Sequence, residues 1–162
     1  WDFKGKRQVL STNVTRKRSG AFPFTLPYRL INMFSVKGDN VLDPFLGTGT
    51  TTLAAVASQR NSIGYELEKK FYDMIDGNIT RSGNWLNTFI ENRLNTHKNF
   101  INKVIDTEGI TKLYTCRFHD FYVKTRQERD IEINMIQSIS RRKGIYTVKY
   151  DEINNELQCS SF

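Results

Sequence analysis

Apolar positions along the chain fall into two patterns, which predict two kinds of element. Short continuous apolar runs at residues 40–43 and 63–66 are typical of buried parallel strands. Between residues 84 and 105, apolar side chains recur every three or four positions, which predicts an amphipathic helix. Residues 113–123 and 145–150 are rich in β-branched and aromatic side chains, so we expect strands there.

These patterns divide the chain into three regions. Residues 1–21 are polar and basic and predict a loop or extended arm. Residues 22–81 hold all three prolines and a glycine-rich turn, and they predict an α/β region. Residues 82–162 predict an extension made of a helix and short strands, with Asn154-Asn155 turning a terminal hairpin. This extension could contact a partner chain or DNA.

The glycine-rich turn follows the first apolar run and precedes an alanine-rich helix. Gly47 and Gly49 allow a backbone path too tight for residues with side chains, and Thr50 or Thr51 is expected to cap the helix. A helix N-terminus offers free N–H groups and a positive dipole end, which suit an anion. Glu66 ends the second apolar run at about the spacing expected of an acid that binds ribose hydroxyls. The turn therefore predicts a site for a nucleoside-type cofactor.

The residues missing from this turn narrow the choice of cofactor. The third glycine of a dinucleotide fingerprint is absent, and no Gly-Lys-Ser/Thr follows, which excludes a P-loop. Asp43 would repel a pyrophosphate, but it suits the ammonium group of an amino acid, while the helix N-terminus suits the carboxylate. S-adenosylmethionine carries both of these groups and a ribose.

Four short stretches of the chain carry a resemblance to a known family. The stretches are Phe22-Pro23-x-x-Leu26 with Arg29-Leu30-Ile31, Val41-Leu42-Asp43-Pro44-Phe45-x-Gly47-Thr48-Gly49-Thr50-Thr51, Arg60-Asn61-x-Ile63-Gly64-x-Glu66, and Tyr72. They resemble the cofactor-binding motifs X, I and II of the methyltransferases that modify DNA at adenine N6 or cytosine N4. Motif X directly before motif I is typical of the permuted β group of that family. One departure is visible, because the family often has His-Pro-Ala where this chain has Arg18-Ser19-Gly20-Ala21.

The resemblance implies a role for each matching residue toward S-adenosyl-L-methionine. Asp43 and the backbone of residues 45–51 would hold the methionine part, Glu66 would take the ribose hydroxyls, and Leu67 would pack on the adenine. Residues 20–23 would line the other side. Two structural alternatives stay open: a turn or capping aspartate for Asp43, and a solvated strand end for Glu66. The cofactor-binding set is Gly20, Ala21, Phe22, Pro23, Asp43, Pro44, Phe45, Gly47, Thr48, Gly49, Thr50, Thr51, Glu66 and Leu67.

The catalytic loop of the resembled family is missing from this sequence. That loop reads Asp/Asn/Ser-Pro-Pro-aromatic and acts on a flipped base. Here Pro23, Pro27 and Pro44 are the only prolines and none are adjacent, so no catalytic residue is predicted. Two strands before residue 82 are also too few to bury their own faces. We therefore expect an α/β fold that is part of a Rossmann-like class I methyltransferase sheet, completed by another chain or an upstream fragment, with a C-terminal α+β extension.

Charge and cysteine content limit which partners and which cell compartment are expected. The net charge is +7 with a pI near 9.5, which favours a polyanion such as DNA. Two cysteines make no disulfide framework and no apolar run is long enough for a membrane span, so a cytoplasmic protein without membrane contact is expected. Cys116 and His119, with His97 and Cys159, could form a zinc set, but the spacing matches no familiar module and no metal is predicted. Candidate phosphate contacts, with solvated surface as the alternative, are Arg16, Lys17, Arg18, Arg141, Arg142 and Lys143.

Two functions remain open. The first is the S-adenosylmethionine-binding subunit or half of a site-specific DNA amino-methyltransferase of a restriction-modification system. Its catalytic loop would come from a second polypeptide or an upstream fragment. The second is a non-catalytic, cofactor-sensing or regulatory DNA-binding subunit.

Overall fold

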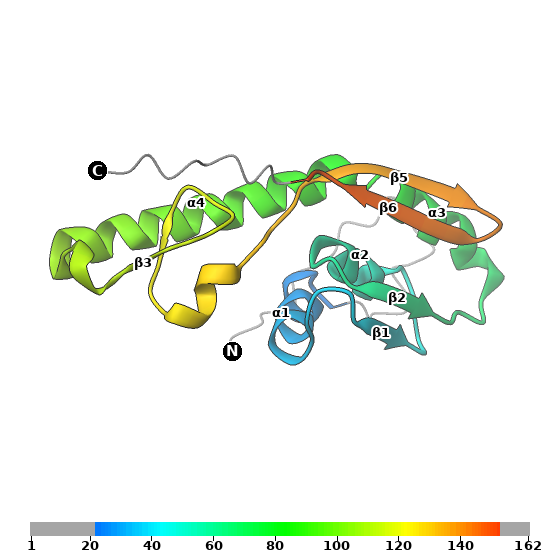
Figure 1. The fold of residues 1–162 in the computed structure, drawn as a ribbon. Helices are drawn as coiled ribbons and strands as arrows, with labels where there is room; N and C mark the ends of the chain where they lie inside the picture. The colour runs from blue at the N-terminus through cyan, green and yellow to red at the C-terminus, as the bar shows by residue number, and fades with distance from the viewer. Residues whose placement is uncertain (1–21, 153–162) are drawn as a thin grey trace.

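The computed structural model describes residues 22–152, and Figure 1 shows the arrangement of their elements. Its first half alternates helices and strands, whereas its second half is a long helix followed by short strands. The elements of the first half are α1 (Thr25–Phe34), β1 (Asn40–Asp43), α2 (Thr50–Ala57), β2 (Asn61–Gly64), the 3-10 helix η2 (Lys69–Phe71) and α3 (Tyr72–Thr80). Those of the second half are α4 (Gly83–Glu108), η3 (Ile110–Lys112), β3 (Tyr114–Thr115), β4 (Tyr122–Val123), η4 (Arg126–Asp130), β5 (Ile136–Arg142) and β6 (Ile145–Tyr150).

Strands β1 and β2 form a two-stranded parallel sheet with α2 as the crossover between them. The pairing runs from Asn40 opposite Asn61 to Asp43 opposite Gly64. Helix α2 packs on one face of this sheet, where the hydroxyl groups of Thr52 and Ser62 lie 2.9 Å apart. The parallel β-α-β unit predicted from the sequence is therefore present.

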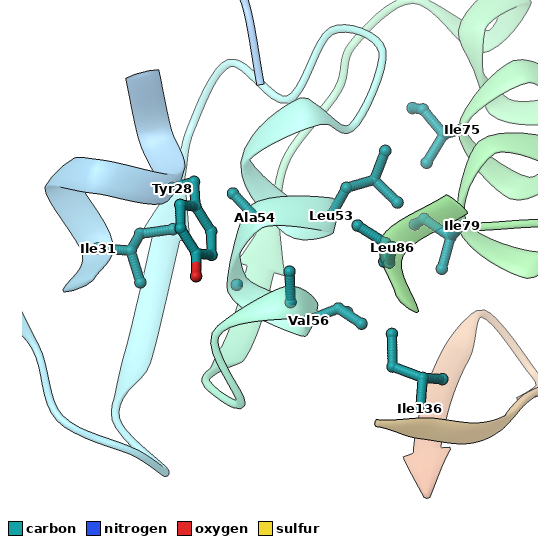
Figure 2. Close-up of a cluster of buried hydrophobic side chains, with 11 residues drawn as sticks. Tyr28, Ile31, Leu53, Ala54, Val56, Ile75, Ile79, Leu86 and Ile136 are labelled. Carbon is teal, nitrogen blue, oxygen red and sulfur yellow. The ribbon is translucent and has the colours of Figure 1, made fainter. Parts of the chain in front are cut away.

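Helix α2 lies at the centre of the main hydrophobic core, as Figure 2 shows. Ala54 and Ala55 are fully buried, because a methyl side chain lets neighbouring elements approach α2 closely. Four neighbours supply the larger core residues: Tyr28 and Ile31 from α1, Ile75 and Ile79 from α3, Leu86 from α4 and Ile136 from β5.

The opposite face of the parallel sheet is apolar and exposed. Side chains alternate between the two faces of a strand, so Leu42 of β1 and Ile63 of β2 share this face, and Tyr65 continues it. Their exposed fractions are 62%, 52% and 63%. The prediction that both strands are buried is therefore wrong for this face, since no described element covers it. Within residues 22–152 this observation agrees with the companion prediction that two strands are too few to bury their own faces.

Helix α4 confirms the amphipathic helix predicted over residues 84–105 and links two hydrophobic clusters. Near its start, Leu86 is fully buried in the main core. Near its end, Ile101 and Val104 are buried outside that core, where α4 contacts β4. Val123 of β4 is also fully buried. The end of α4 therefore carries a small separate cluster, and the predicted strand region 113–123 is two short antiparallel strands.

Strands β5 and β6 form an antiparallel hairpin that covers α2 on the side away from the parallel sheet (Figure 1). The Tyr150 hydroxyl donates a hydrogen bond to the carbonyl oxygen of Val56 at 2.8 Å. Lys143 and Gly144 have φ values of 51° and 78°, as a two-residue type I′ turn requires. Strand β6 matches the predicted strand 145–150, whereas β5 was not predicted. The predicted hairpin at Asn154-Asn155 lies outside the described residues, as does the basic arm 1–21.

No helix within residues 22–152 combines the length and the apolar character that crossing a membrane requires.

Candidate functional site

The turn between β1 and α2 folds back against the end of β2. The backbone N–H of Leu46 donates to the Tyr65 carbonyl oxygen at 2.9 Å, and the Tyr65 N–H donates to the Asp43 carbonyl oxygen at 2.9 Å. Gly47 and Gly49 have φ values of 57° and 85°, in the left-handed region that favours glycine. The predicted need for glycine at both positions is therefore confirmed.

Helix α2 begins without a side-chain cap. Gly49 occupies the N-cap position, so Thr50 and Thr51 already lie in the first turn of the helix. The Thr50 hydroxyl instead lies 3.3 Å from the Thr48 hydroxyl. The prediction that Thr50 or Thr51 caps the helix is wrong, because the left-handed glycine starts the helix one residue earlier. The backbone N–H groups of this first turn lie at the positive end of the helix dipole, and no side-chain oxygen caps them.

The Glu66 carboxylate is bound directly to the turn. Its Oε2 accepts a hydrogen bond from the Gly47 N–H at 2.9 Å, and its Oε1 accepts one from the Glu68 N–H at 2.8 Å. The interpretation of Glu66 as a solvated strand end is therefore wrong. A carboxylate has about four lone-pair positions, so about two remain for further donors such as a pair of ribose hydroxyls.

The Asp43 carboxylate belongs to the same turn. Its Oδ1 accepts a hydrogen bond from the Phe45 N–H at 3.0 Å, which is the geometry of an Asx turn. The turn-aspartate alternative is therefore observed. This bond involves one of the two carboxylate oxygens, which leaves acceptor capacity on the other for a cation.

Two contacts that support the site were not identified from the sequence. The Asn78 side-chain amide of α3 donates to the Thr48 carbonyl oxygen at 2.9 Å. Leu46 packs on Gly64, where an added Cβ would lie 2.6 Å from the Leu46 Cδ1 atom. A glycine inside a strand signals such a close approach, but no sequence signal identifies Asn78.

Large apolar side chains beside the two carboxylates point into solvent. Phe45 is 88% exposed and Leu67 is 96% exposed. Pro44 is exposed as well, while Phe22 and Pro23 lead into α1. Gly20 and Ala21 lie outside the described residues. Among the predicted cofactor-binding residues that the structure describes, Asp43, Glu66 and the glycine backbone lie close together. Exposed apolar side chains lie next to them.

The basic candidates differ from one another in their surroundings. Arg141 forms an ion pair with Asp76 of α3, with its Nε 3.2 Å from the Asp76 Oδ1. Arg142 and Lys143 are exposed at the end of the hairpin. Arg16, Lys17 and Arg18 lie outside the described residues. Arg141 is thus held against the protein by an acidic partner, unlike its two neighbours.

The residues considered for zinc are hydrogen-bonded to backbone groups. Cys116 Sγ donates to the Ile131 carbonyl oxygen at 3.4 Å, and His97 Nε2 donates to the Tyr122 carbonyl oxygen at 2.9 Å. His119 Nε2 accepts the Ile133 N–H at 3.0 Å, and burial lowers the pKa of this imidazole below its usual value. Residues 22–152 contain no cluster of His, Cys, Asp or Glu that could hold a metal ion. Cys159 lies outside that range.

Known proteins match the sequence of this turn and its surroundings. Residues 1–77 match a family model described as DNA methylase. The Type II methyltransferase M.MthZI of Methanothermobacter thermautotrophicus is 43% identical over 161 residues, which are 99% of this chain and 44% of that protein. The Type II methyltransferase M.MjaI of Methanocaldococcus jannaschii is 48% identical over 79 residues, which are 49% of this chain and 25% of that protein.

Among solved structures, a putative DNA modification methylase of Thermus thermophilus, complexed with S-adenosyl-L-methionine, is 45% identical. The match covers 37% of this chain and 25% of that one, with a TM-score of 0.36. The matches in sequence confirm the resemblance to the DNA amino-methyltransferases. This chain spans less than half the length of the relatives described above.

Proposed function

We propose that this chain is the cofactor-binding half of a site-specific DNA amino-methyltransferase of a restriction-modification system. The methyl donor would be S-adenosyl-L-methionine, and the acceptor would be adenine N6 or cytosine N4. The family match over residues 1–77 and the relatives named as Type II methyltransferases support this proposal.

The groups at the turn fit the chemistry of this cofactor. The Asp43 carboxylate offers acceptor oxygens for the ammonium group, and the uncapped start of α2 offers donors for the carboxylate. Glu66 keeps acceptor capacity for the ribose hydroxyls after its two backbone bonds. Phe45 and Leu67 offer uncovered apolar surface for the flat adenine. The bound cofactor would supply an electrophilic methyl group on a sulfonium.

The observation that carries the split-site part of the proposal is the exposed apolar face of the parallel sheet. Leu42 and Ile63 leave about half or more of their surface uncovered. A parallel sheet is normally covered on both faces, which supports the proposal that further chain completes this one. The sequence also lacks the Pro-Pro-aromatic loop, so the same missing part would supply the groups that accept the amino hydrogens of the flipped base.

In the permuted motif order, the catalytic half precedes motif X. The missing part would therefore be a segment upstream of this chain or a second polypeptide. The relative M.MthZI is long enough to contain such a half, because the match covers 44% of it.

The regulatory alternative has no comparable support. The relatives described above are named as methyltransferases, and no feature of residues 22–152 is specific to a sensor that lacks chemistry.

The test is transfer of a tritiated methyl group from S-adenosylmethionine to duplex DNA. The 162-residue chain alone should transfer no methyl groups above background, and the same chain with its upstream part or partner should be active. Mass spectrometry of the purified native protein identifies that part. Robust transfer by the 162-residue chain alone, with no further fragment detected, would show the split-site proposal to be wrong. Absence of transfer by the completed protein on any DNA would overturn the methyltransferase proposal itself.

A further inference from the structure

We infer that the outward face of the β5–β6 hairpin is a backbone-contacting surface for double-stranded DNA. The inference rests on the proposed function, and it assigns to that function a surface in the region outside the family match, residues 78–162. We define the outward face by its residues: Ser138, Ser140, Arg142, Lys143, Ile145, Thr147 and Lys149.

The two faces of the hairpin have opposite compositions. Ile139 opposite Val148 and Arg141 opposite Tyr146 face the protein, because Ile139, Tyr146 and Val148 pack on the main core. The pairs between them therefore face outward: Ser138 with Lys149, Ser140 with Thr147, and Arg142 with Ile145. The outward residues of both strands are exposed.

The chemistry of the outward face suits phosphate. It offers three cationic side chains and three hydroxyl groups, and none of its residues is acidic. Lys and Arg side chains with Ser and Thr hydroxyls are the groups that contact the DNA backbone. The nearest acids along β6, Asp151 and Glu152, follow the strand at the end opposite the turn.

Arg141 binds Asp76, whereas the neighbouring cations Arg142 and Lys143 are available to contact phosphate. Its ion pair with Asp76 and the hydrogen bond from the Tyr146 hydroxyl to Asp76 at 2.8 Å anchor the inner face of the hairpin to α3. The Asp76 carboxylate is therefore occupied by two groups of the inner face of the hairpin. Arg142 lies on the outward face and Lys143 lies in the turn, and both are exposed.

The position of the hairpin agrees with a role beside the cofactor turn. Helix α3 contacts both features, since Asp76 holds the hairpin and Asn78 donates to the Thr48 carbonyl oxygen two residues later. In Figure 1, the β5–β6 turn points to the same end of the molecule as the ends of β1 and β2, where the cofactor turn begins. DNA lying along the outward face would therefore extend toward the end of the sheet where the methyl donor is proposed to bind.

The inference is tested in the native protein that contains this chain, with a duplex DNA probe and a salt titration. The variant is Arg142→Gln, Lys143→Asn and Lys149→Gln. Asn at position 143 keeps the turn, because Asn-Gly is a preferred type I′ pair. The matched control removes three cations from the far end of the molecule: Lys103→Gln, Lys112→Gln and Arg126→Gln.

Loss of three phosphate contacts should lower the slope of log affinity against log salt by about two to three units, equally for specific and unrelated sequences. The control should keep the parental slope, and both proteins should keep the parental affinity for S-adenosylmethionine by calorimetry. An unchanged slope in the hairpin variant, or an equal change in the control, would overturn the inference while leaving the proposed function intact. Absence of DNA binding by the parental protein would overturn both.

Discussion

The two small sheets on opposite sides of α2 differ in the composition of the face turned away from α2. The parallel pair β1–β2 covers α2 with one face and leaves apolar Leu42 and Ile63 exposed on the other. The hairpin β5–β6 also covers α2 with an apolar face, but its outward face is polar and basic. The polar free face suits a sheet that is complete by itself, whereas the apolar free face suits the proposal that the parallel pair is part of a larger sheet.

The difference follows from how each pair is connected. An antiparallel hairpin closes through a two-residue turn, so β5 and β6 need only the core beneath them. Parallel strands need a crossover and are normally covered on both faces. Within residues 22–152, α2 supplies one cover for β1 and β2 and no described element supplies the other.

The strongest test of this comparison changes the free face of the parallel sheet. Leu42→Ser with Ile63→Ser should lower the free energy of unfolding of the completed protein by about 3 kcal/mol or more, since each buried aliphatic side chain contributes about 1.5–3 kcal/mol. In the isolated 162-residue chain, the same change should cost little and should reduce the binding of a hydrophobic dye. Denaturant unfolding measures the first effect and dye fluorescence the second.

The control for this test lies on the hairpin. Ser138→Ala with Thr147→Ala changes two outward, exposed residues and should shift the stability of both forms by no more than about 0.5 kcal/mol. Equal stability losses from the sheet double variant in the isolated and completed proteins would contradict the idea that this face is covered by further chain.

The next largest effect is expected at the turn that joins β1 to α2. In the completed protein, Asp43→Ala and Glu66→Ala should each weaken S-adenosylmethionine binding by about 1–3 kcal/mol, because each leaves donors on the cofactor unpaired. Isothermal calorimetry measures the change. Asp106→Ala on the exposed surface of α4 is the matched acidic control. Unchanged affinity in both turn variants would remove the assignment of this site.

A smaller effect is expected where the hairpin contacts α2. Tyr150→Phe removes the bond to the Val56 carbonyl oxygen and should lower stability at neutral pH by about 1 kcal/mol. Burial raises the Tyr150 pKa from 10.0 to about 12, so the unfolded chain loses this proton first as the pH rises. The tyrosine's contribution is therefore complete below pH 10 and is lost between pH 10 and about 12.

The alkaline unfolding curve of the Phe variant should accordingly be flatter than that of the parent. Tyr114→Phe, at an exposed tyrosine, is the control. If the Tyr150→Phe variant and its parent gave identical alkaline curves, the contact between Tyr150 and Val56 would be excluded as the cause of this pH dependence.

The smallest effect concerns His119, in the cluster at the end of α4. Its Nε2 must be unprotonated to accept the Ile133 N–H, and burial lowers its pKa below the ordinary value of 6.5. The unfolded chain therefore binds this proton at a higher pH than the folded chain, so stability should fall as the pH drops below about 6.5. His119→Gln should reduce the acid slope in a pH series of thermal melts, and an unchanged slope would exclude this imidazole as the cause.

The sequence predicted elements whose pattern is strong along the chain. The helix over residues 84–105 and the strand 145–150 carry continuous patterns, and the left-handed glycines follow from a tight turn after a strand. Strand β5 was not predicted because Ser-Ile-Ser-Arg-Arg is mostly polar, and its pairing depends on the turn at Lys143-Gly144.

The details of the site depended on contacts between distant segments. No local pattern predicts the bond from Asn78 to Thr48, because it joins residues from separate elements. The glycine at position 64 signals a close approach, but it does not identify Leu46 as the neighbouring residue. The cap of α2 was misassigned for a local reason, since a glycine in the left-handed region replaced the expected threonine.

Helix α4 has a consequence for how this chain can change during evolution. At about 1.5 Å per residue, its 26 residues extend about 39 Å, far enough to carry its end well beyond the main core. The main core takes no buried side chain from residues 91–135, and the chain returns to it only at Ile136, just after the buried Asn134 accepts hydrogen bonds from Lys37 and Gln59. Insertions and deletions within residues 97–131 therefore fall outside the main core and leave the spacing around Gly47 and Glu66 unchanged.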